Sequence, residues 1–434
     1  MSSKQNKLSS AEIREVKKAL STVSGAIRDS QTMTREELPE PVAPATGLWP
    51  RMFGWSRPEP VLPSQLKQKA LALVKKYRKD IDVPDLPRIQ AEMKVFFRSQ
   101  RKQPYYRLMD LRAEKEDRRL VIIGDTHCDY NSLAGIIEKL SVSGYDYFEK
   151  ATFIFLGDYL DRGNILFEYV MLLIGLKKLL GERCILMKGN HELISFNPAY
   201  QELESKVEPS DSCPLLNKYC GTDKEFLALF ADYFSSLPTY ILLKTRKGTD
   251  LLVHGGIPRD IYIDRCHIVP ETGELKVKGD DFVRGQILDN MIWADPRPEK
   301  SKLQGGGSRF EFGEEQFMRF AVLNKIDRIF RSHEPVNNGI KSFYGDRVIT
   351  IFSNGGRDNS LTGYSYVDNP AFGIMNADGE IRYESVHLKK CSCKYGFSEF
   401  STYLYMGKLA EPGLSAKVED PHLNDEFQVV SIVN

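Results

Sequence analysis

The sequence predicts a layered α/β or α+β enzyme. From about residue 104, short apolar runs alternate with helical patterns, and a block of consecutive strand-like segments follows near the C-terminus. Early alternation followed by consecutive strands is typical of sheets covered by helices. In addition, several of the apolar runs end in Gly-Asp, Gly-Asn or Val-His. Because ligands in such folds bind at the carboxyl ends of strands, these ends are the first place to look for a site.

The amino-acid composition and net charge limit the classes of protein to which the chain can belong. The chain has 434 residues, of which 41% are hydrophobic and 11% aromatic, so it can bury a substantial core. Its 60 basic and 59 acidic residues leave a formal net charge of +1. We expect no nucleic-acid partner, because proteins that bind DNA or RNA usually carry a basic excess or a basic face.

Cysteine content and hydropathy predict a cytoplasmic protein. The seven cysteines have irregular spacing, which favours free thiols in a reducing compartment. The first ten residues are polar and do not resemble a secretory signal. We also expect no membrane span, because no run approaches about 18 apolar residues.

The N-terminal quarter is predicted to be helical and linker-like. Residues 1–38 form a charged helical segment in which Ser9 and Glu12 fit a capping box. Residues 39–63 form a proline-rich linker, and residues 64–103 form a helical extension of two amphipathic helices. The N-terminal helices are candidates for docking a protein partner, for capping the catalytic domain, or for both.

Residues 104–403 are predicted to form the catalytic domain, and residues 404–434 a tail. Early strands are expected at 120–123, 152–156, 184–187, 240–243 and 251–253, with a helix at 165–180. Later strands are expected at 348–352, 364–367, 372–375 and 380–386. Residues 194–224 are expected to form an inserted helical hairpin over the site, with helices at 201–207 and 224–234.

Side chains able to hold metal ions follow the predicted strands. Mixed carboxylate, carboxamide and imidazole ligands suit divalent ions such as Mn, Fe, Zn or Mg. Two ions about 3.5–4 Å apart can share a water, lower its pKa and clamp phosphoryl oxygens. We therefore expect two divalent ions, phosphoester hydrolysis, and a bridging hydroxide as the nucleophile. The candidate ligands are Asp125, His127, Asp158, Asn190, His254 and His333.

Three neighbouring residues are candidates for further steps of the reaction. The guanidinium of Arg162 matches two phosphate oxygens. His191 is a candidate for the general acid that protonates the leaving oxygen. Asp161 can hold that imidazole in one tautomer and stabilise its protonated form.

The motifs, taken in order, resemble those of the PPP phosphoprotein phosphatase family. GDTHC, GDYLDRG, GNHE, HGG and RSHE are similar to the family's GDxHG, GDxxDRG, GNHE, HGG and late histidine. MIWADP resembles the family's LLWSDP, and the resemblance covers roughly residues 118–355. It implies a calcineurin-like metallophosphoesterase fold, in which a central β-sandwich is flanked by helices and carries a binuclear metal site at one edge.

The resemblance also implies individual roles. Arg162 and Asn190 would bind phosphate, and His191 paired with Asp161 would be the acid. The six ligands are divided between two ions. One ion would be held by Asp125, His127 and Asp158, and the other by Asp158, Asn190, His254 and His333.

Several positions depart from the family's pattern. Cys128 and Lys188 stand where the family has glycine and arginine, and Gly306 falls at the position of a second phosphate-binding arginine. Arg309 is a possible substitute for that arginine. The segment from Ser353 to Asp358, which includes Gly355, lacks the family's site tyrosine. Arg357 could supply a phosphate-binding charge there, or could equally be a solvated loop arginine.

These departures favour a substrate larger than phosphoserine. Loss of a tyrosine and gain of glycines leave room for an aryl phosphate, with residues 194–224 as one wall. We therefore expect a protein tyrosine phosphatase, with a protein serine/threonine phosphatase as the alternative and a dinucleoside-polyphosphate hydrolase as a further one. The N-terminal helical additions also resemble the Wip-type effector phosphatases of intracellular bacterial pathogens, which implies action in a host-cell cytosol.

Overall fold

The computed structural model describes residues 63–82, 85–114, 118–163, 165–207, 210–298, 309–359, 361–386 and 388. The predicted N-terminal segment (1–38), the tail (404–434), Gly306 and all of the linker except residue 63 lie outside these residues. None of the described helices combines the length and the apolar content needed to cross a membrane.

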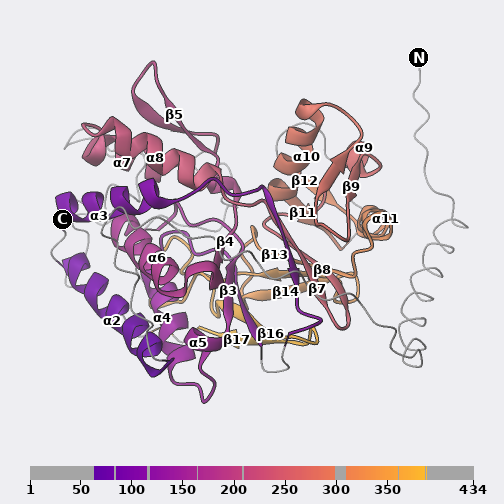
Figure 1. Ribbon diagram of the computed structural model, residues 1–434, viewed down its shortest axis with the longest axis horizontal. Coiled ribbons are helices and arrows are strands. Elements are labelled where there is room, and N and C mark those ends of the chain that lie inside the picture. Colours follow the sequence, from indigo (N-terminus) through magenta and orange to yellow (C-terminus); the bar gives the residue numbers. More distant parts are fainter. Residues whose placement is uncertain are drawn as a thin grey trace, which may run out of the picture.

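Two β-sheets stacked face to face form the centre of the molecule, which confirms the predicted β-sandwich (Figure 1). One sheet has five strands, in the order β17 (Ile381–Ser385), β16 (Ala371–Asn376), β2 (Arg119–Ile123), β3 (Thr152–Phe155) and β4 (Cys184–Leu186). The other has six, in the order β1 (Tyr106–Asp110), β7 (Tyr240–Thr245), β8 (Gly248–Val253), β13 (Arg328–Arg331), β15 (Val348–Ile351) and β14 (Ile340–Phe343).

The central strands of both sheets are buried on both faces, as their near-continuous apolar sequences predict. In β2, Leu120 and Ile122 lie between the sheets, whereas Val121 and Ile123 belong to the core beneath the helices. Successive side chains of a strand point to opposite faces, so a run of four apolar residues supplies both cores. Strands β2, β3 and β4 are parallel, as are β8, β13 and β15, so their carboxyl ends lie at a shared edge.

Helices cover the outer face of each sheet (Figure 1). Over the five-stranded sheet lie α2 (Pro63–Asp82), α3 (Leu86–Ser99), α4 (Tyr130–Ser141), α5 (Tyr147–Lys150), α6 (Leu166–Leu180), α7 (Ser212–Cys220) and α8 (Lys224–Ser235). Over the six-stranded sheet lie α9 (Asp260–Ile263), α10 (Asp281–Trp293) and α11 (Glu314–Asn324), with the strand pairs β9 (Cys266–Ile268)–β10 (Leu275–Val277) and β11 (Ala294–Pro296)–β12 (Phe310–Phe312). Two 3₁₀ turns, η2 (Gly181–Arg183) and η3 (Asn190–Glu192), flank β4.

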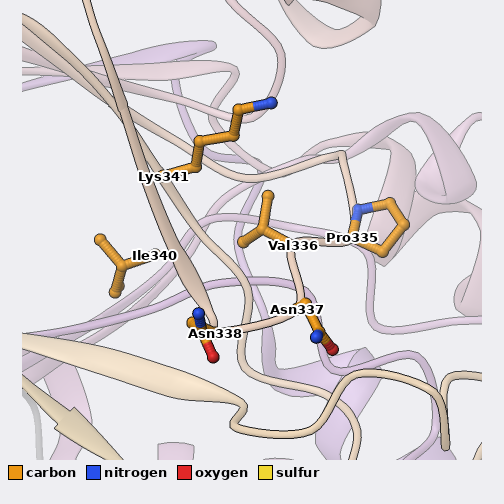
Figure 2. Close-up of a pocket in the computed structure, with 6 residues that line it drawn as sticks. All are labelled: Pro335, Val336, Asn337, Asn338, Ile340 and Lys341. Carbon is orange, nitrogen blue, oxygen red and sulfur yellow. The ribbon is translucent and has the colours of Figure 1, made fainter.

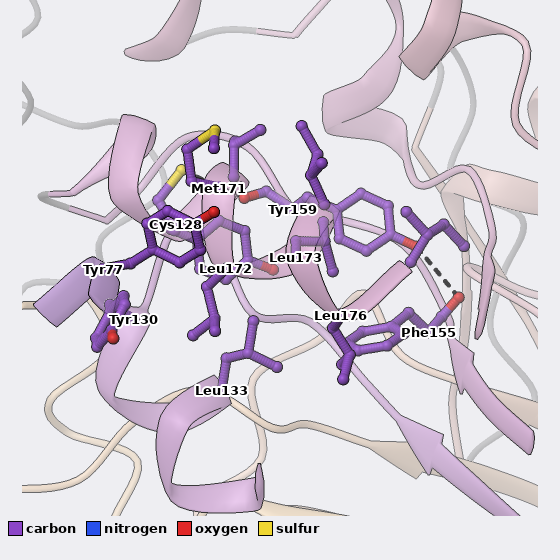
Figure 3. Packing of buried hydrophobic residues seen from close by; sticks show 14 of the residues in the cluster. Tyr77, Cys128, Tyr130, Leu133, Phe155, Tyr159, Met171, Leu172, Leu173 and Leu176 are labelled. Atoms are coloured by element: carbon purple, nitrogen blue, oxygen red, sulfur yellow. Dashed lines mark hydrogen bonds between the residues drawn. The ribbon is translucent and has the colours of Figure 1, made fainter. Parts of the chain in front are cut away.

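The helical extension is part of the catalytic domain's core. Helix α2 lies so close to α6 that a Cβ on Gly175 would come within 3.0 Å of Leu73. Tyr77 of α2 is buried in the same cluster as Cys128 and Leu172 (Figure 3). Of the roles predicted for the N-terminal helices, α2 and α3 therefore cap the catalytic core.

The inserted segment differs from the predicted helical hairpin. It begins as a β-hairpin of β5 (Ile194–Asn197) and β6 (Glu202–Ser205), so the helix predicted at 201–207 is wrong. Asn197 Oδ1 accepts from the backbone N–H of Ala199 at 2.9 Å, which forms a local turn and reverses the chain. Leu203 is buried between the exposed Glu202 and Glu204, a period of two that indicates a strand.

The strand predicted at 364–367 is also wrong. These residues form turns, in which the N–H of Val367 donates to Tyr364 O at 2.9 Å. The segment is tied instead to the loop after β3, because the N–H of Gly363 donates to Arg162 O at 2.9 Å. Three strands that the sequence pattern did not single out, β1, β13 and β14, complete the six-stranded sheet.

Replacing Phe97 with alanine tests whether α3 stabilises the domain. The Phe97 ring is buried in an aromatic cluster, with its centroid 5.5 Å from that of Phe230 and 5.1 Å from that of Tyr233. We expect Phe97→Ala to lower the free energy of unfolding by about 3–5 kcal/mol in urea denaturation. Val95→Ala, on the same helix but 65% exposed, should change it by less than about 0.5 kcal/mol. Equal effects of the two variants would contradict this role for α3.

Candidate active site

All six predicted metal ligands meet at the shared edge of the two sheets. Each lies just beyond the carboxyl end of a strand, and each is buried. The five-stranded sheet positions four of them and the six-stranded sheet positions two. After β2 come Asp125 and His127, after β3 Asp158, after β4 Asn190, after β8 His254 and after β13 His333.

Asp158 lies between two groups of ligands, as expected of a bridging carboxylate. Its Oδ2 is 3.4 Å from His127 Nε2 and 3.2 Å from His254 Nε2. His254 Nε2 is also 3.2 Å from His333 Nδ1. Among the described residues, Asp158 belongs both to a group with His127 and His191 and to a group with His254 and His333, each compact enough to hold one ion.

Backbone carbonyls orient two of the imidazoles. His127 Nδ1 donates to Leu160 O at 2.7 Å, and His254 Nδ1 donates to Leu156 O at 3.0 Å. In the neutral form of each ring the proton is therefore on Nδ1, and the lone pair of Nε2 faces the other ligands. Fixing the tautomer in this way is how proteins prepare histidines as metal ligands.

The donor set fits divalent cations. Asn190 Oδ1 is 3.0 Å from His254 Nε2, so two acceptor atoms face each other. Turning the amide over would place its nitrogen 2.9 Å from His333 Nδ1 instead. With its oxygen inward the amide can hold a cation, and with its nitrogen inward it can donate to His333 Nδ1 and Asp158 Oδ2. Asp125 Oδ2 and His333 Nε2 are likewise buried and make no hydrogen bond to a described residue. Oxygen and imidazole donors of this kind suit Mn, Fe, Zn or Mg.

The electrostatics of the cluster also favour positive charge on the His127 side. Burial lowers the pKa of His127, but Asp125 and Asp158 raise it to about 9. Burial raises the pKa of Asp158, but the neighbouring His254 and His191 bring it well below its usual range. The Asp158 carboxylate therefore remains charged although it is buried, which a bound cation would stabilise.

The backbone is strained at several site residues. His127, Asp158, Asp161, Arg162 and His333 have φ angles of 41°, 54°, 65°, 63° and 71°. Residues other than glycine rarely adopt this region, and each costs on the order of 1–3 kcal/mol unless the surroundings hold it. Here the N–H groups of Thr126 and His127 donate to Asp158 O at 3.2 and 2.9 Å, which ties the first two ligand loops together.

Glu192 holds the loop that carries Asp158, a role that the sequence analysis missed. Its buried carboxylate accepts from the N–H groups of Asp158 and Tyr159 at 2.8 Å and from that of Gly189 at 2.9 Å. Burial and the charge of Asp158 raise the pKa of Glu192 to about 7, while these hydrogen bonds lower it. The signal available in the sequence was the final glutamate of GNHE, because an acidic residue directly after Asn190 and His191 is expected to be buried with them.

His191 and Asp161 form the predicted pair. His191 Nδ1 is 2.6 Å from Asp161 Oδ2, and both residues are buried. Although burial raises the pKa of Asp161, hydrogen bonding to His191 lowers it. Asp161 Oδ1 also accepts from the N–H groups of Asp211 and Ser212 at 2.9 and 2.7 Å. Backbone N–H groups at the start of α7, in the inserted segment, thus hold the pair of His191 and Asp161 in position. The sequence did not reveal this contact.

The predicted phosphate-binding residues divide into two groups. Asn190 and Arg162 lie in the loops that carry the ligands and the His191–Asp161 pair. Arg357 does not join them. Its side chain is 80% exposed and forms an ion pair with Asp368, so the structure favours the alternative of a solvated loop arginine. Arg309 lies nearer the site, with Nε 2.6 Å from Asp295 Oδ2, and Asp295 Oδ1 is 3.9 Å from His333 Nε2.

Two aromatic residues border the ligands without having been predicted as site residues. The Tyr364 ring stacks on that of His127, with centroids 5.2 Å apart and planes at 28°. The Trp293 ring meets His333 edge to face, with centroids 5.7 Å apart. The tryptophan of MIWADP was a signal for the second contact, but Tyr364 lies in a segment that the sequence pattern indicated as a strand.

One surface hollow near His333 lies apart from these groups. It has a volume of about 330 Å³ and is formed by the continuous segment from Pro335 to Lys341, as Figure 2 shows. No predicted ligand or phosphate-binding residue lines it. It is therefore not part of the candidate site.

Residues 118–337 match the calcineurin-like phosphoesterase family. The chain belongs to this family. Family membership implies divalent metal ions, in agreement with the donor set described above.

Several curated relatives of the chain are protein serine/threonine phosphatases. A probable serine/threonine-protein phosphatase of Encephalitozoon cuniculi is 30% identical over 286 residues, which cover 63% of this chain and 56% of that protein. Human serine/threonine-protein phosphatase 5 is 28% identical over 240 residues, which cover 55% of this chain and 43% of that protein. The chain thus matches only about half the length of these relatives.

A protein serine/threonine phosphatase from Saccharomyces cerevisiae has a similar fold. Its solved structure superposes with a TM-score of 0.50 at 20% identity, over 75% of this chain and 91% of the other. At this identity the similarity supports the fold alone. It agrees with the sandwich and its edge site.

Removing divalent ions is expected to destabilise the protein. A ligand that binds only the folded state adds about 2.7 kcal/mol at a free concentration of 100 times its Kd. We expect a chelator to lower the melting temperature and added Mn²⁺ to restore it. By calorimetric titration, the protein should bind two Mn²⁺ per chain and His254→Ala at most one. Asp378→Asn, at an exposed carboxylate, serves as the control. Unchanged stoichiometry in His254→Ala would contradict the assignment.

Loss of the general acid should depend on the leaving group. We expect His191→Ala to lower kcat on phosphoserine peptides by about 10²–10⁴-fold, because the serine alkoxide needs a proton as it leaves. The loss on p-nitrophenyl phosphate should be much smaller, since p-nitrophenolate leaves without one. Asp161→Asn should show the same pattern, and His267→Ala, at an exposed histidine, should show neither effect. Equal losses on both substrates would argue against this role.

Proposed function

We propose that the chain hydrolyses phosphoserine and phosphothreonine in proteins. The observation that carries this proposal is the buried cluster of six ligands beside the hydrogen-bonded pair of His191 and Asp161. A binuclear ligand set, an imidazole with a carboxylate partner and a loop arginine make up the groups that phosphomonoester hydrolysis requires. The names of the curated relatives support a protein serine/threonine phosphatase.

The residues have distinct tasks in this reaction. When bound, two divalent ions supply a water of lowered pKa and positive charge for the phosphoryl oxygens. Asn190 and Arg162 orient the phosphate, the arginine through its planar fork of donors. His191 gives a proton to the leaving oxygen from Nε2, while Asp161 accepts from Nδ1–H and stabilises the protonated ring.

The predicted preference for phosphotyrosine is not supported, and the alternative fits better. Cys128, one basis for that preference, is buried in the helical core, with Sγ donating to Tyr159 O at 3.3 Å (Figure 3). Lys188 is likewise engaged below the surface, where Nζ donates to Ser235 O at 2.8 Å. A Cβ on Gly355 would come within 2.6 Å of Val367 O, so this glycine allows close packing rather than a wider mouth.

A protein partner for the N-terminal helices, cytoplasmic location and injection as a bacterial effector stay predictions.

Substrate choice is tested with three peptides that differ only in the phosphorylated residue. With Mn²⁺ present, we expect kcat/KM for phosphoserine and phosphothreonine to exceed that for phosphotyrosine by at least about tenfold, because Cys128 and Gly355 are packed in the interior and do not widen the site. Asp158→Asn is the inactive control. A preference for phosphotyrosine would restore the original prediction and reject this one.

A further inference from the structure

The ring of Tyr364 lies against the imidazole of His127, one of the ligands predicted for the first metal ion. The two centroids are 5.2 Å apart and the planes meet at 28°. The Tyr364 ring also meets the buried Phe352 edge to face, with centroids 5.1 Å apart and planes at 72°. Stacked and edge-to-face contacts at such distances are the arrangements that aromatic rings prefer. The imidazole of His127 therefore has a flat neighbour that is itself packed against the interior.

Hydrogen bonds tie the turn of Tyr364 to the loop that carries His127. The N–H of Tyr364 donates to Thr362 Oγ1 at 3.0 Å, and this hydroxyl donates to Asn354 Oδ1 at 2.5 Å. The same carboxamide donates from Nδ2 to Thr126 O at 3.1 Å. Thr126 directly precedes His127, so this chain of hydrogen bonds ends at the peptide next to the ligand.

The same turn is also attached to the loop after β3, which carries the shared carboxylate. The N–H of Gly363 donates to Arg162 O at 2.9 Å, and Thr362 forms an antiparallel bridge with Gly163. Two ligand loops thus hold the turn. The position of the Tyr364 ring is therefore set by the same segments that set the positions of the ligands.

His127 needs such support because its backbone and one edge of its ring are all that the chain fixes directly. Its φ angle is 41°, a region that residues other than glycine rarely adopt, so surrounding contacts have to offset the cost. The hydrogen bond from Nδ1 to Leu160 O holds one edge of the imidazole. A ring held at one nitrogen can still tilt about that atom, whereas contact with the face of another ring restricts its plane. This plane sets the direction in which Nε2 presents its lone pair.

We propose that Tyr364 is a positioning residue for one of the two metal ions and acts through the plane of the His127 imidazole. The inference rests on the metal site of the proposed function and not on the choice of substrate. Because His127 is assigned to one ion only, Tyr364 supports that ion and not the ion on His254 and His333. The face of the ring makes the contact, so a phenylalanine at this position should serve equally well.

The test is calorimetric titration with Mn²⁺ of proteins that keep the ligands of a single ion. His254→Ala leaves the ligands on the His127 side, and His127→Ala leaves those on the other side. Adding Tyr364→Ala to the His254→Ala protein should raise the Kd for Mn²⁺ about tenfold, the lower end of the effect of losing a group that orients a ligand. Adding it to the His127→Ala protein should change the Kd by less than about twofold, because the ring then has no ligand to orient.

Further substitutions in the His254→Ala protein show whether the flat ring is what matters. Tyr364→Phe keeps the ring and should bind Mn²⁺ as the protein with tyrosine does. Tyr364→Leu fills the same space with an apolar side chain that has no flat face, and should weaken binding as alanine does. Tyr200→Ala, at a tyrosine that is 74% exposed, is the control and should leave the Kd unchanged. The melting temperature without metal reports whether each variant is folded.

Three results would overturn the positioning role and leave the proposed function standing. They are an unchanged Kd when Tyr364→Ala is added to the His254→Ala protein, an equal weakening in both single-ion proteins, and equal binding by the leucine and phenylalanine variants. If Tyr364→Ala does not fold, the comparison of leucine with phenylalanine decides alone. A chain without substitutions that binds no Mn²⁺ would reject the metal site of the proposed function, and the positioning role with it.

Discussion

Asp158 is the carboxylate shared by the two groups of side chains that could each hold a metal ion, and the surrounding loops hold it in place. It is buried with one oxygen within 3.4 Å of two imidazoles, and its φ angle is positive. A buried charge costs several kcal/mol unless it is paired or bound to a cation. The hydrogen bonds from its own N–H to Glu192 and from the ligand loop to its carbonyl oxygen offset that cost. Removing any one of these supports would release the loop that carries the shared ligand.

The two sheets and the inserted segment both help to hold Asp158 and the residues around it in place. Parallel strands from both sheets deliver ligands to a single edge, and the buried Arg331 ties three of the loops there. It donates to Gly255 O at 2.5 Å and pairs with Asp295 at 2.9 Å and Glu334 at 2.9 Å. On the other side, the start of α7 fixes Asp161 with two backbone N–H groups. The insertion therefore holds the pair of His191 and Asp161 in place.

Much of the fold was predictable because its signals are local. The apolar strands β2, β3, β4 and β8 end in ligands, and a run of apolar residues before a polar one is visible in the sequence. The hairpin of β5 and β6 was mistaken for a helix because its residues are mostly polar, and its turn depends on the side chain of Asn197. Likewise, Tyr364 reaches His127 only because its turn is bonded to the loop of Arg162.

The six candidate ligands and the pair of His191 and Asp161 could be predicted from the sequence, because residue type and position after an apolar run are local properties. The location of the altered neighbouring residues became clear only from the folded chain. Cys128 and Lys188 lie in or near the core, Arg357 lies in solvent, and Glu192 lies under Asp158. Whether a side chain faces a groove or a core depends on contacts between segments far apart in the chain. The spacing of residues along a strand does not reveal those contacts.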